Sequence, residues 1–274
     1  IIIPDGVTEI RSHAFCGCTS LTSIIIPDSV TSINGNVFTN CSSLTSITIP
    51  NGIRTIKISA FLGCSSLTSI TIPSSVTQIG QHAFCRCSSL TSITLPGRVT
   101  TIEEEAFDGC SSLTSITIPN SVTQIGRHAF CRCSSLTSIT ISNNVTQIEA
   151  ETFYGCSNLD HMVIPDSLNN QDTNYWACRG IDLNKTKLVT HKQLSEWVKG
   201  YALEGQYSMD TLYTLYQLQK DEHYQPSWSE LGRKSRHIII RDLLNILPKD
   251  KKNVVLPHTL IGQHDSKEGQ LLHT

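Results

Sequence analysis

The stretch Leu90-Thr91-Ser92-Ile93-Thr94-Leu95-Pro96 decides the fold, because near-copies of it return along the first 165 residues. Its opening leucine recurs every 23 residues, at Leu21, Leu44, Leu67, Leu90, Leu113, Leu136 and Leu159. Such a fixed period is the signature of a solenoid, in which each repeat is one coil that buries its apolar face only by stacking on its neighbours. Function is therefore expected on a surface.

Apolar and polar residues alternate within this stretch, since Ile93 and Leu95 are separated by Ser92 and Thr94. The alternation predicts a short strand with one set of side chains facing inward and the other facing solvent. One such strand per coil, in register, predicts a parallel sheet. The proline that closes nearly every copy has no N–H to donate, so it ends strand pairing at the same height in each coil.

The core is predicted from further columns of the repeat. Every phenylalanine of the chain belongs to one column: Phe15, Phe38, Phe61, Phe84, Phe107, Phe130 and Phe153. If each buried apolar side chain contributes about 1.5–3 kcal/mol, a coil offsets its ordering entropy only when a neighbour covers it. One or two isolated coils are therefore expected to be unfolded, and no phenylalanine is spare to line a pocket for a small-molecule substrate.

The chain has eleven cysteines, of which seven form a column three residues before the recurring leucine. A cysteine packs like a small hydrophobe with a weak S–H donor, so we expect buried, reduced thiols and a reducing compartment. Cys16, Cys85 and Cys131 add C-x-C pairs. Cys85 and Cys131 lie two coils apart, about 10 Å, so they cannot share one zinc ion. Neither a metal nor another cofactor is expected.

Together, Leu-x-x-Ile-x-Ile-Pro, Val-Thr-x-Ile and Ala-Phe-x-x-Cys at a 23-residue period resemble the BspA-type leucine-rich repeat family. The resemblance covers about residues 1–165. It implies a curved leucine-rich-repeat solenoid with a parallel β-sheet and about seven coils, which binds protein and has no catalytic residues. Surface members of the family are adhesins, whereas this sequence shows neither a cell-wall sorting motif nor a membrane anchor.

Candidate partner-binding residues lie where the solvent-facing columns change character. In the column before Ala-Phe, histidine and glutamate alternate over the last four coils. This pattern is typical of a charge-balanced surface ladder, and it is also compatible with a polar patch for a partner. The candidates for partner binding are Arg86, Arg132, His82, Glu105, His128, Tyr154, Asp160, His161 and Trp176.

The 23-residue period ends after Pro165, and the sequence then predicts a small α-helical C-terminal cap over residues 166–248. Trp176 is expected to pack over the last coil, because the open end of a solenoid exposes core and sheet edge. Thr190-x-x-Gln193 is a capping box that opens a helix.

Two more helices are expected in the cap, one opening at Ser208 or Asp210 and one at Ser227-x-x-Glu230. Residues 249–274 mix charge, glycine and isolated apolar residues, which predicts a loosely ordered tail.

Composition argues against two partner classes. A net charge of -2 over 274 residues gives no electrostatic reason to expect nucleic acid or an anionic membrane. The basic cluster at residues 233–241 is more typical of the solvent-exposed face of a helix than of a phosphate-binding site. No stretch approaches the roughly 18 apolar residues that a membrane helix needs. Because the sequence opens on Ile1-Ile2-Ile3-Pro4, the tail of a repeat, we expect residues upstream of it.

These observations favour a non-enzymatic protein-binding module. The ending Leu271-Leu272-His273-Thr274 resembles the C-terminal export signals of type IV secreted effectors from bacteria of the Legionella kind. The leading hypothesis is therefore an effector, delivered into host cytosol, that binds and inhibits or regulates another protein of host or bacterium. The alternatives are an adhesin at the bacterial surface and an enzyme that uses the repeats as a targeting arm. For an enzyme whose chemistry would lie in the helical segment, Cys178 with His191 is the only nearby Cys/His pair.

Overall fold

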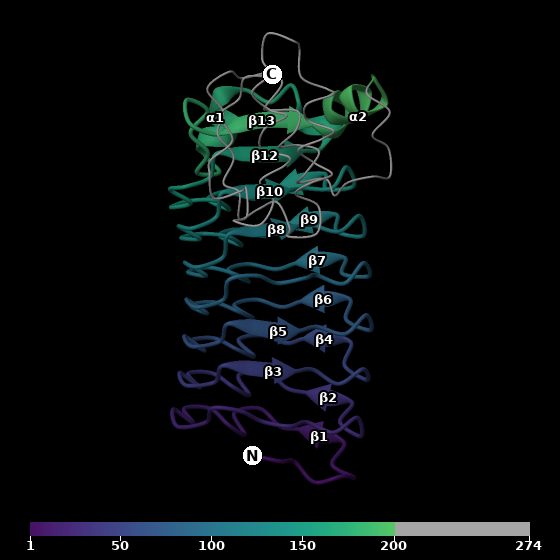
Figure 1. The fold of residues 1–274 in the computed structure, drawn as a ribbon, viewed down its shortest axis with the longest axis vertical. Helices are drawn as coiled ribbons and strands as arrows, with labels where there is room; N and C mark the ends of the chain where they lie inside the picture. Colours follow the sequence, from purple (N-terminus) through teal and green to yellow (C-terminus); the bar gives the residue numbers. More distant parts are fainter. Residues whose placement is uncertain (201–274) are drawn as a thin grey trace, which may run out of the picture. The chain divides into compact units, whose positions relative to one another are not determined.

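The structure is a computed structural model that describes residues 1–200. The chain divides into two compact units, Ile1–Gln193 and Leu194–Thr274. The first unit is a stack of coils that follow the sequence from one end of the stack to the other (Figure 1). The two helices predicted after residue 200, the basic cluster at 233–241 and the tail at 249–274 lie outside the described residues.

The coils carry two series of short parallel strands rather than the single series that the sequence predicted. The Ser-Ile-Thr copies and their successor give β3 (Ser46–Thr48), β5 (Ser69–Thr71), β8 (Ser115–Thr117), β10 (Ser138–Thr140) and β12 (His161–Ile164). The Val-Thr-x-Ile copies give β1 (Glu9–Ile10), β2 (Ser32–Ile33), β4 (Thr55–Ile56), β6 (Gln78–Ile79), β7 (Thr101–Ile102), β9 (Gln124–Ile125) and β11 (Gln147–Ile148). Pairing within both series joins residues one period apart, such as Ile116 with Ile139 and Ile102 with Ile125.

The copy at residues 90–96 forms no strand, which leaves a break between β5 and β8. Its side chains still alternate, because Ile93 and Leu95 are buried whereas Ser92 and Thr94 are exposed. Inward burial of every second residue is therefore the constant feature of the repeat.

A ladder of stacked phenylalanine rings runs through the core of the first unit. The rings of successive coils lie 5.3–5.8 Å apart between centroids, with interplanar angles of 14° or less. All are fully buried except Phe15, which is half-buried in the first coil. Offset stacking of this kind adds stabilisation beyond the buried area. The phenylalanine column predicted from the period is confirmed as core.

The cysteine column lies beside this ladder, and its thiols donate hydrogen bonds to the backbone carbonyl groups of the phenylalanines. The thiols of Cys64, Cys87 and Cys110 each donate to the backbone oxygen of the phenylalanine 26 residues earlier, at 3.1–3.2 Å. Cys41, Cys133 and Cys156 make the same hydrogen bond to the phenylalanine of the preceding coil. Burial is the main cause that raises the pKa of Cys64 to about 12, so the thiol keeps its proton. A cysteine is suited to this position because it is small and apolar and donates one weak hydrogen bond.

The solenoid extends one coil beyond the boundary expected at residue 165. Strand β13 (Lys187–Thr190) pairs with β12 in parallel, joining His161 to Lys187 across 26 residues instead of 23. The longer coil also holds a 3-10 turn, η1 (Asp166–Leu168), and the helix α1 (Thr173–Ala177). The domain boundary expected at residue 165 therefore falls inside the first compact unit, because the sheet continues to β13 although the 23-residue pattern has ended.

Helix α1 brings Trp176 into the core, as expected of a residue that closes the stack. The indole is 1% exposed, and the side chain of Asp172 caps the helix by accepting from the Tyr175 N–H at 2.7 Å. Helix α2 (His191–Gly200) begins at the predicted capping box. The Thr190 N–H donates to Gln193 Oε1 at 2.9 Å, and the Gln193 N–H donates to Thr190 Oγ1 at 3.1 Å. Neither α1 nor α2 has the length and hydrophobicity that would let a helix cross a membrane.

Candidate protein-binding site

The turn before Ala-Phe places one residue of each coil in the left-handed backbone region. Seven residues share φ angles of 52–63° there: His13, Asn36, Ser59, His82, Glu105, His128 and Glu151. Glycine adopts this conformation without strain, whereas a residue with a Cβ atom costs about 1 kcal/mol or more. No coil uses glycine at this column, so each side chain is retained at a conformational cost.

A second left-handed position follows four residues later and alternates between glycine and larger residues. Its members have φ angles of 58–76° and are Gly17, Asn40, Gly63, Arg86, Gly109, Arg132 and Gly155. A Cβ atom at Gly155 would lie 3.3 Å from Arg132 Cγ, and one at Gly109 would lie 3.6 Å from Arg86 Cγ. Each arginine therefore packs over the glycine of the next coil, which gives this edge a period of two coils.

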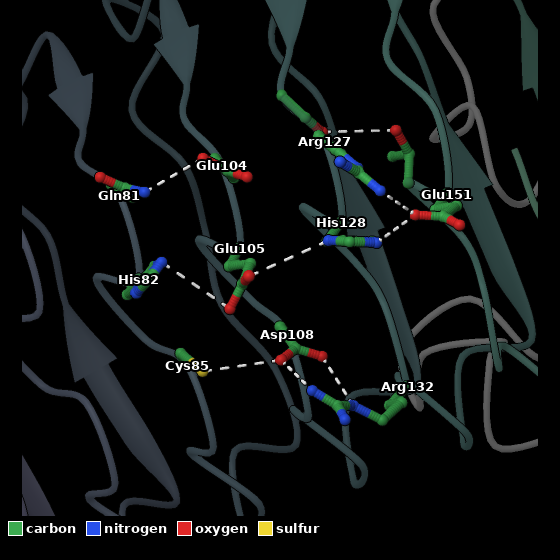
Figure 2. Close-up of polar contacts among 12 residues, drawn as sticks. Gln81, His82, Cys85, Glu104, Glu105, Asp108, Arg127, His128, Arg132 and Glu151 are labelled. Atoms are coloured by element: carbon green, nitrogen blue, oxygen red, sulfur yellow. Dashed lines mark hydrogen bonds and ion pairs between the residues drawn. The ribbon is translucent and has the colours of Figure 1, made fainter.

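Imidazole and carboxylate groups from four coils form a ladder along this edge (Figure 2). His82 Nε2 lies 3.7 Å from Glu105 Oε2, and His128 Nδ1 lies 3.9 Å from Glu105 Oε1. Glu151 Oε2 lies 2.6 Å from both His128 Nε2 and Arg127 Nη2. Hydrogen bonds from Arg127 and then His128 lower the pKa of Glu151. The alternation predicted from the sequence thus produces real contacts between coils.

Beneath the ladder, Asp108 is a buried carboxylate held by an exposed arginine. Asp108 is 1% exposed. Arg132 donates one hydrogen bond from Nε to Asp108 Oδ1 at 2.9 Å and a second from Nη2 to Asp108 Oδ2. The Cys85 thiol lies on the other side, with Sγ 3.7 Å from Asp108 Oδ2. Burial first, and then the negative charges of Asp108 and Glu105, raise the pKa of Cys85 to about 12.

A half-open cavity of about 260 Å³ lies between the ladder and this ion pair. Its lining is formed by Glu105, Asp108, His128, Cys131, Arg132, Glu151 and Tyr154. Four of the sequence candidates thus meet at one place, and a fifth, His82, contacts it through Glu105. Arg86 is exposed on the same edge, two coils before Arg132.

The other candidates lie elsewhere. Asp160 is exposed just before β12, whereas His161 is 6% exposed within that strand. Burial, followed by the charge of Lys187, lowers the pKa of His161 to about 4. Trp176 belongs to the core. His161 and Trp176 are therefore buried rather than exposed, and Trp176 packs in the core of the last coils.

Sequence reasoning missed Asp108, Cys131 and Glu151 as parts of the site. Asp108 shares its column with residues as different as Leu62 and Tyr154, so the column seemed tolerant. The available signal was the period itself, which places Asp108 one coil after Cys85.

The Cys/His pair considered for an enzyme is not assembled in residues 1–200. His191 Nε2 donates to the Ile141 carbonyl oxygen at 2.6 Å, while Cys178 is exposed at the end of α1. Within that range no hydrogen bond or ion pair joins the two side chains.

Replacing Arg132 with alanine is expected to lower the free energy of unfolding by about 1–3 kcal/mol, because the buried Asp108 carboxylate loses its charged donor. Chemical denaturation of the full chain measures the change. Arg86→Ala is the matched control, since it removes the same side chain from the equivalent turn without uncovering a carboxylate. Equal stability of the two variants would contradict a structural role for the Arg132–Asp108 pair.

Comparison with curated proteins gives no match to this chain. Among solved structures, a leucine-rich repeat protein of T. pallidum is 30% identical and aligns over 61% of this chain and 70% of its own, with a TM-score of 0.50. A leucine-rich repeat protein of Eubacterium ventriosum ATCC 27560 is 24% identical over 63% of this chain and 44% of its own, with a TM-score of 0.51, which shows the fold alone.

A family model supplies the assignment. The model of the BspA type leucine rich repeat region matches residues 1–111 and 78–195, in six copies. The matched range reaches past residue 165 and includes the last coil, in agreement with the pairing of β12 and β13. The chain therefore belongs to the BspA-type leucine-rich repeat family.

Proposed function

We propose that this chain is a protein-interaction module without catalytic activity of its own, and that it binds another protein through one edge of its coils. The edge surface is defined by His82, Arg86, Glu105, Asp108, Arg127, His128, Arg132, Glu151 and Tyr154. The observation that carries the proposal is that six of these side chains line one cavity, beside turns whose left-handed backbone is costly to maintain.

The dimensions of the edge surface favour a protein over a small molecule. Its residues come from four successive coils, which at about 4.8 Å per coil extend over roughly 14 Å. The cavity of about 260 Å³ is smaller than the roughly 300–1,000 Å³ of typical small-molecule sites, so it suits a single side chain of a partner. Arginine and tyrosine, represented by Arg132 and the exposed Tyr154, are enriched among residues that dominate binding energy.

The charge of the edge surface supports the same partner class. Its three carboxylates, Glu105, Asp108 and Glu151, are matched by three guanidinium groups, so the surface has no excess of positive charge that would attract the phosphate groups of nucleic acid or lipid. A protein partner can place positive and negative side chains opposite these charges, and complementary charges of that kind favour specific association.

For the biological setting, we propose a bacterial effector that works in host cytosol, where it binds and inhibits or regulates a host protein or a partner effector. The support is twofold. All eleven cysteines of the chain carry free thiols, which suits a reducing compartment. The last four residues also resemble export signals of such effectors. The competing hypothesis is an adhesin at the bacterial surface, in keeping with surface members of the family.

Thiol titration distinguishes these settings. In the native chain, Cys16 and Cys178 are exposed and are expected to react at once with a thiol reagent, while seven buried cysteines react only after unfolding. Chain purified from its natural compartment under alkylating conditions is expected to yield eleven thiols in denaturant. A count lowered by disulfides would favour the oxidising exterior and the adhesin.

The binding proposal is tested with a partner isolated on the intact chain and then measured against variants. Glu105→Lys places a cation at the centre of the edge surface and is expected to weaken partner affinity by tenfold or more, because charge complementarity at the cavity is reversed. Asp28→Lys is the control, since it makes the same charge change at an exposed site outside the edge surface. Equal affinity of both variants and the unmodified chain would contradict binding at this edge.

A further inference from the structure

Two equivalent turns in adjacent coils place different metal-ligating groups side by side. His82-Ala-Phe-Cys85 and Glu105-Ala-Phe-Asp108 are related by one 23-residue period. The Cys85 Sγ atom, one Glu105 carboxylate oxygen and one Asp108 carboxylate oxygen all lie within 4.8 Å of one another. Figure 2 shows Cys85 and Asp108 facing each other across the two coils, with Glu105 above them.

We propose that Cys85, Glu105 and Asp108 bind a single divalent transition-metal ion such as zinc. The ion would lie between the coil that carries Phe84 and the coil that carries Phe107. Zinc binds sulfur at about 2.3 Å and oxygen at about 2.0–2.2 Å, so two tetrahedral ligands of these kinds are separated by about 3.6 Å. The Cys85 Sγ to Asp108 Oδ2 distance of 3.7 Å already has this value. Glu105 is half-buried at the cavity, and rotation of its side chain brings the third ligand into place.

The donor set selects the class of ion. A thiolate together with carboxylates is typical of zinc and its neighbours, whereas magnesium and calcium prefer oxygen ligands alone. Three protein ligands leave a fourth position for water, which can enter through the cavity that Glu105 and Asp108 line. On binding, the sulfur–metal bond replaces the S–H bond of Cys85, the proton passes to solvent, and nothing is oxidised or reduced.

Charge balance and supporting contacts also suit a divalent ion. One thiolate, two carboxylates and the Arg132 guanidinium together carry two negative charges, which the ion neutralises. Arg132 holds Asp108 through two hydrogen bonds, and the His82 ring lies 3.7 Å from Glu105. Ligating carboxylates are held by outer contacts of this kind, which fix their orientation.

The sequence contains its own control for this site. The hexapeptide His-Ala-Phe-Cys-Arg-Cys occurs at 82–87 and again at 128–133. One coil later, the first copy meets Glu105 and Asp108, whereas the second meets Glu151 and Tyr154. The Cys131 thiol also contacts Asp108, from the coil that follows it, but only Cys85 forms a three-ligand group with Glu105 and Asp108. The C-x-C pairs predicted no metal, because two thiols of one column cannot reach one ion. The proposed site instead uses one thiol and two carboxylates of the next coil, and it is independent of any protein partner.

The test titrates the full chain with cobalt(II) alone as a spectroscopic probe, followed by zinc. One equivalent of cobalt is expected to give the absorption band of a thiolate-to-cobalt charge transfer, and zinc is expected to abolish it. Cys85→Ser is expected to lose the band, while the matched control Cys131→Ser keeps it. Retention of the band in Cys85→Ser, or its loss in Cys131→Ser alone, would overturn the assignment.

A second variant guards against a folding defect at the buried cysteine. Glu105→Gln changes a half-buried side chain by one atom and is expected to weaken zinc affinity at least tenfold, measured by calorimetry with circular dichroism as a check of folding. Unchanged affinity in this variant would also refute the site.

Discussion

Replacing Phe84 with alanine is expected to lower the free energy of unfolding by about 3–5 kcal/mol. Phe84 is fully buried, and its ring stacks on Phe61 at 5.4 Å and on Phe107 at 5.3 Å between centroids. The substitution leaves a cavity between two coils that the ladder cannot close, because strand pairing fixes the spacing of the coils. Chemical denaturation of the full chain, followed by circular dichroism, measures the loss.

The control for this prediction is the first ring of the ladder. Phe15 is half-buried and contacts only Phe38 among the rings of the described residues. Phe15→Ala is therefore expected to cost clearly less than Phe84→Ala, since part of the ring already faces water. Equal losses at both positions would show that stacking between coils does not dominate the stability of the core.

Replacing Gly126 with alanine is expected to destabilise the chain by about 1–3 kcal/mol, the usual cost of overpacking. A Cβ atom at this glycine would lie 2.7 Å from the backbone carbon of Glu103 and from the backbone nitrogen of Glu104. A backbone neighbour cannot rotate away as a side chain can, so the two coils must separate locally. Thermal or chemical unfolding of the variant gives the magnitude.

Gly97 provides the matched control, because no atom lies within 4 Å of a Cβ atom built there. Gly97→Ala is expected to change the free energy of unfolding by no more than about 0.5 kcal/mol. If Gly126→Ala were as neutral as Gly97→Ala, the close approach of adjacent coils at the edge would be wrong.

The core could be predicted from the sequence because the period puts equivalent residues in register. Phe84 and Cys87 belong to columns that were expected to be buried, and both are fully buried, as are Val76, Ile79 and Leu90 at other repeated positions. The last coil could not be predicted in the same way. Its 26-residue offset and the inserted helix α1 break the sequence pattern, although Trp176 supplies the apolar surface that keeps the stack closed.

The candidate site was predictable only in part. Alternation of histidine and glutamate indicated the contact that the structure shows between His128 and Glu151. The buried position of Asp108 gave no such signal, because a carboxylate is buried here only through the arginine one coil later. Left-handed backbone at Glu105 was equally invisible, since glutamate has no preference for that conformation.

The proposed function requires that a partner bind at the edge surface rather than on the sheet face. Hydrogen exchange of the full chain, with and without the isolated partner, distinguishes the two surfaces. Binding at the edge surface is expected to slow exchange at residues 103–109 and 126–132, with no change in β3 and β5. Protection of β3 and β5 with unchanged exchange at the two edge segments would contradict it.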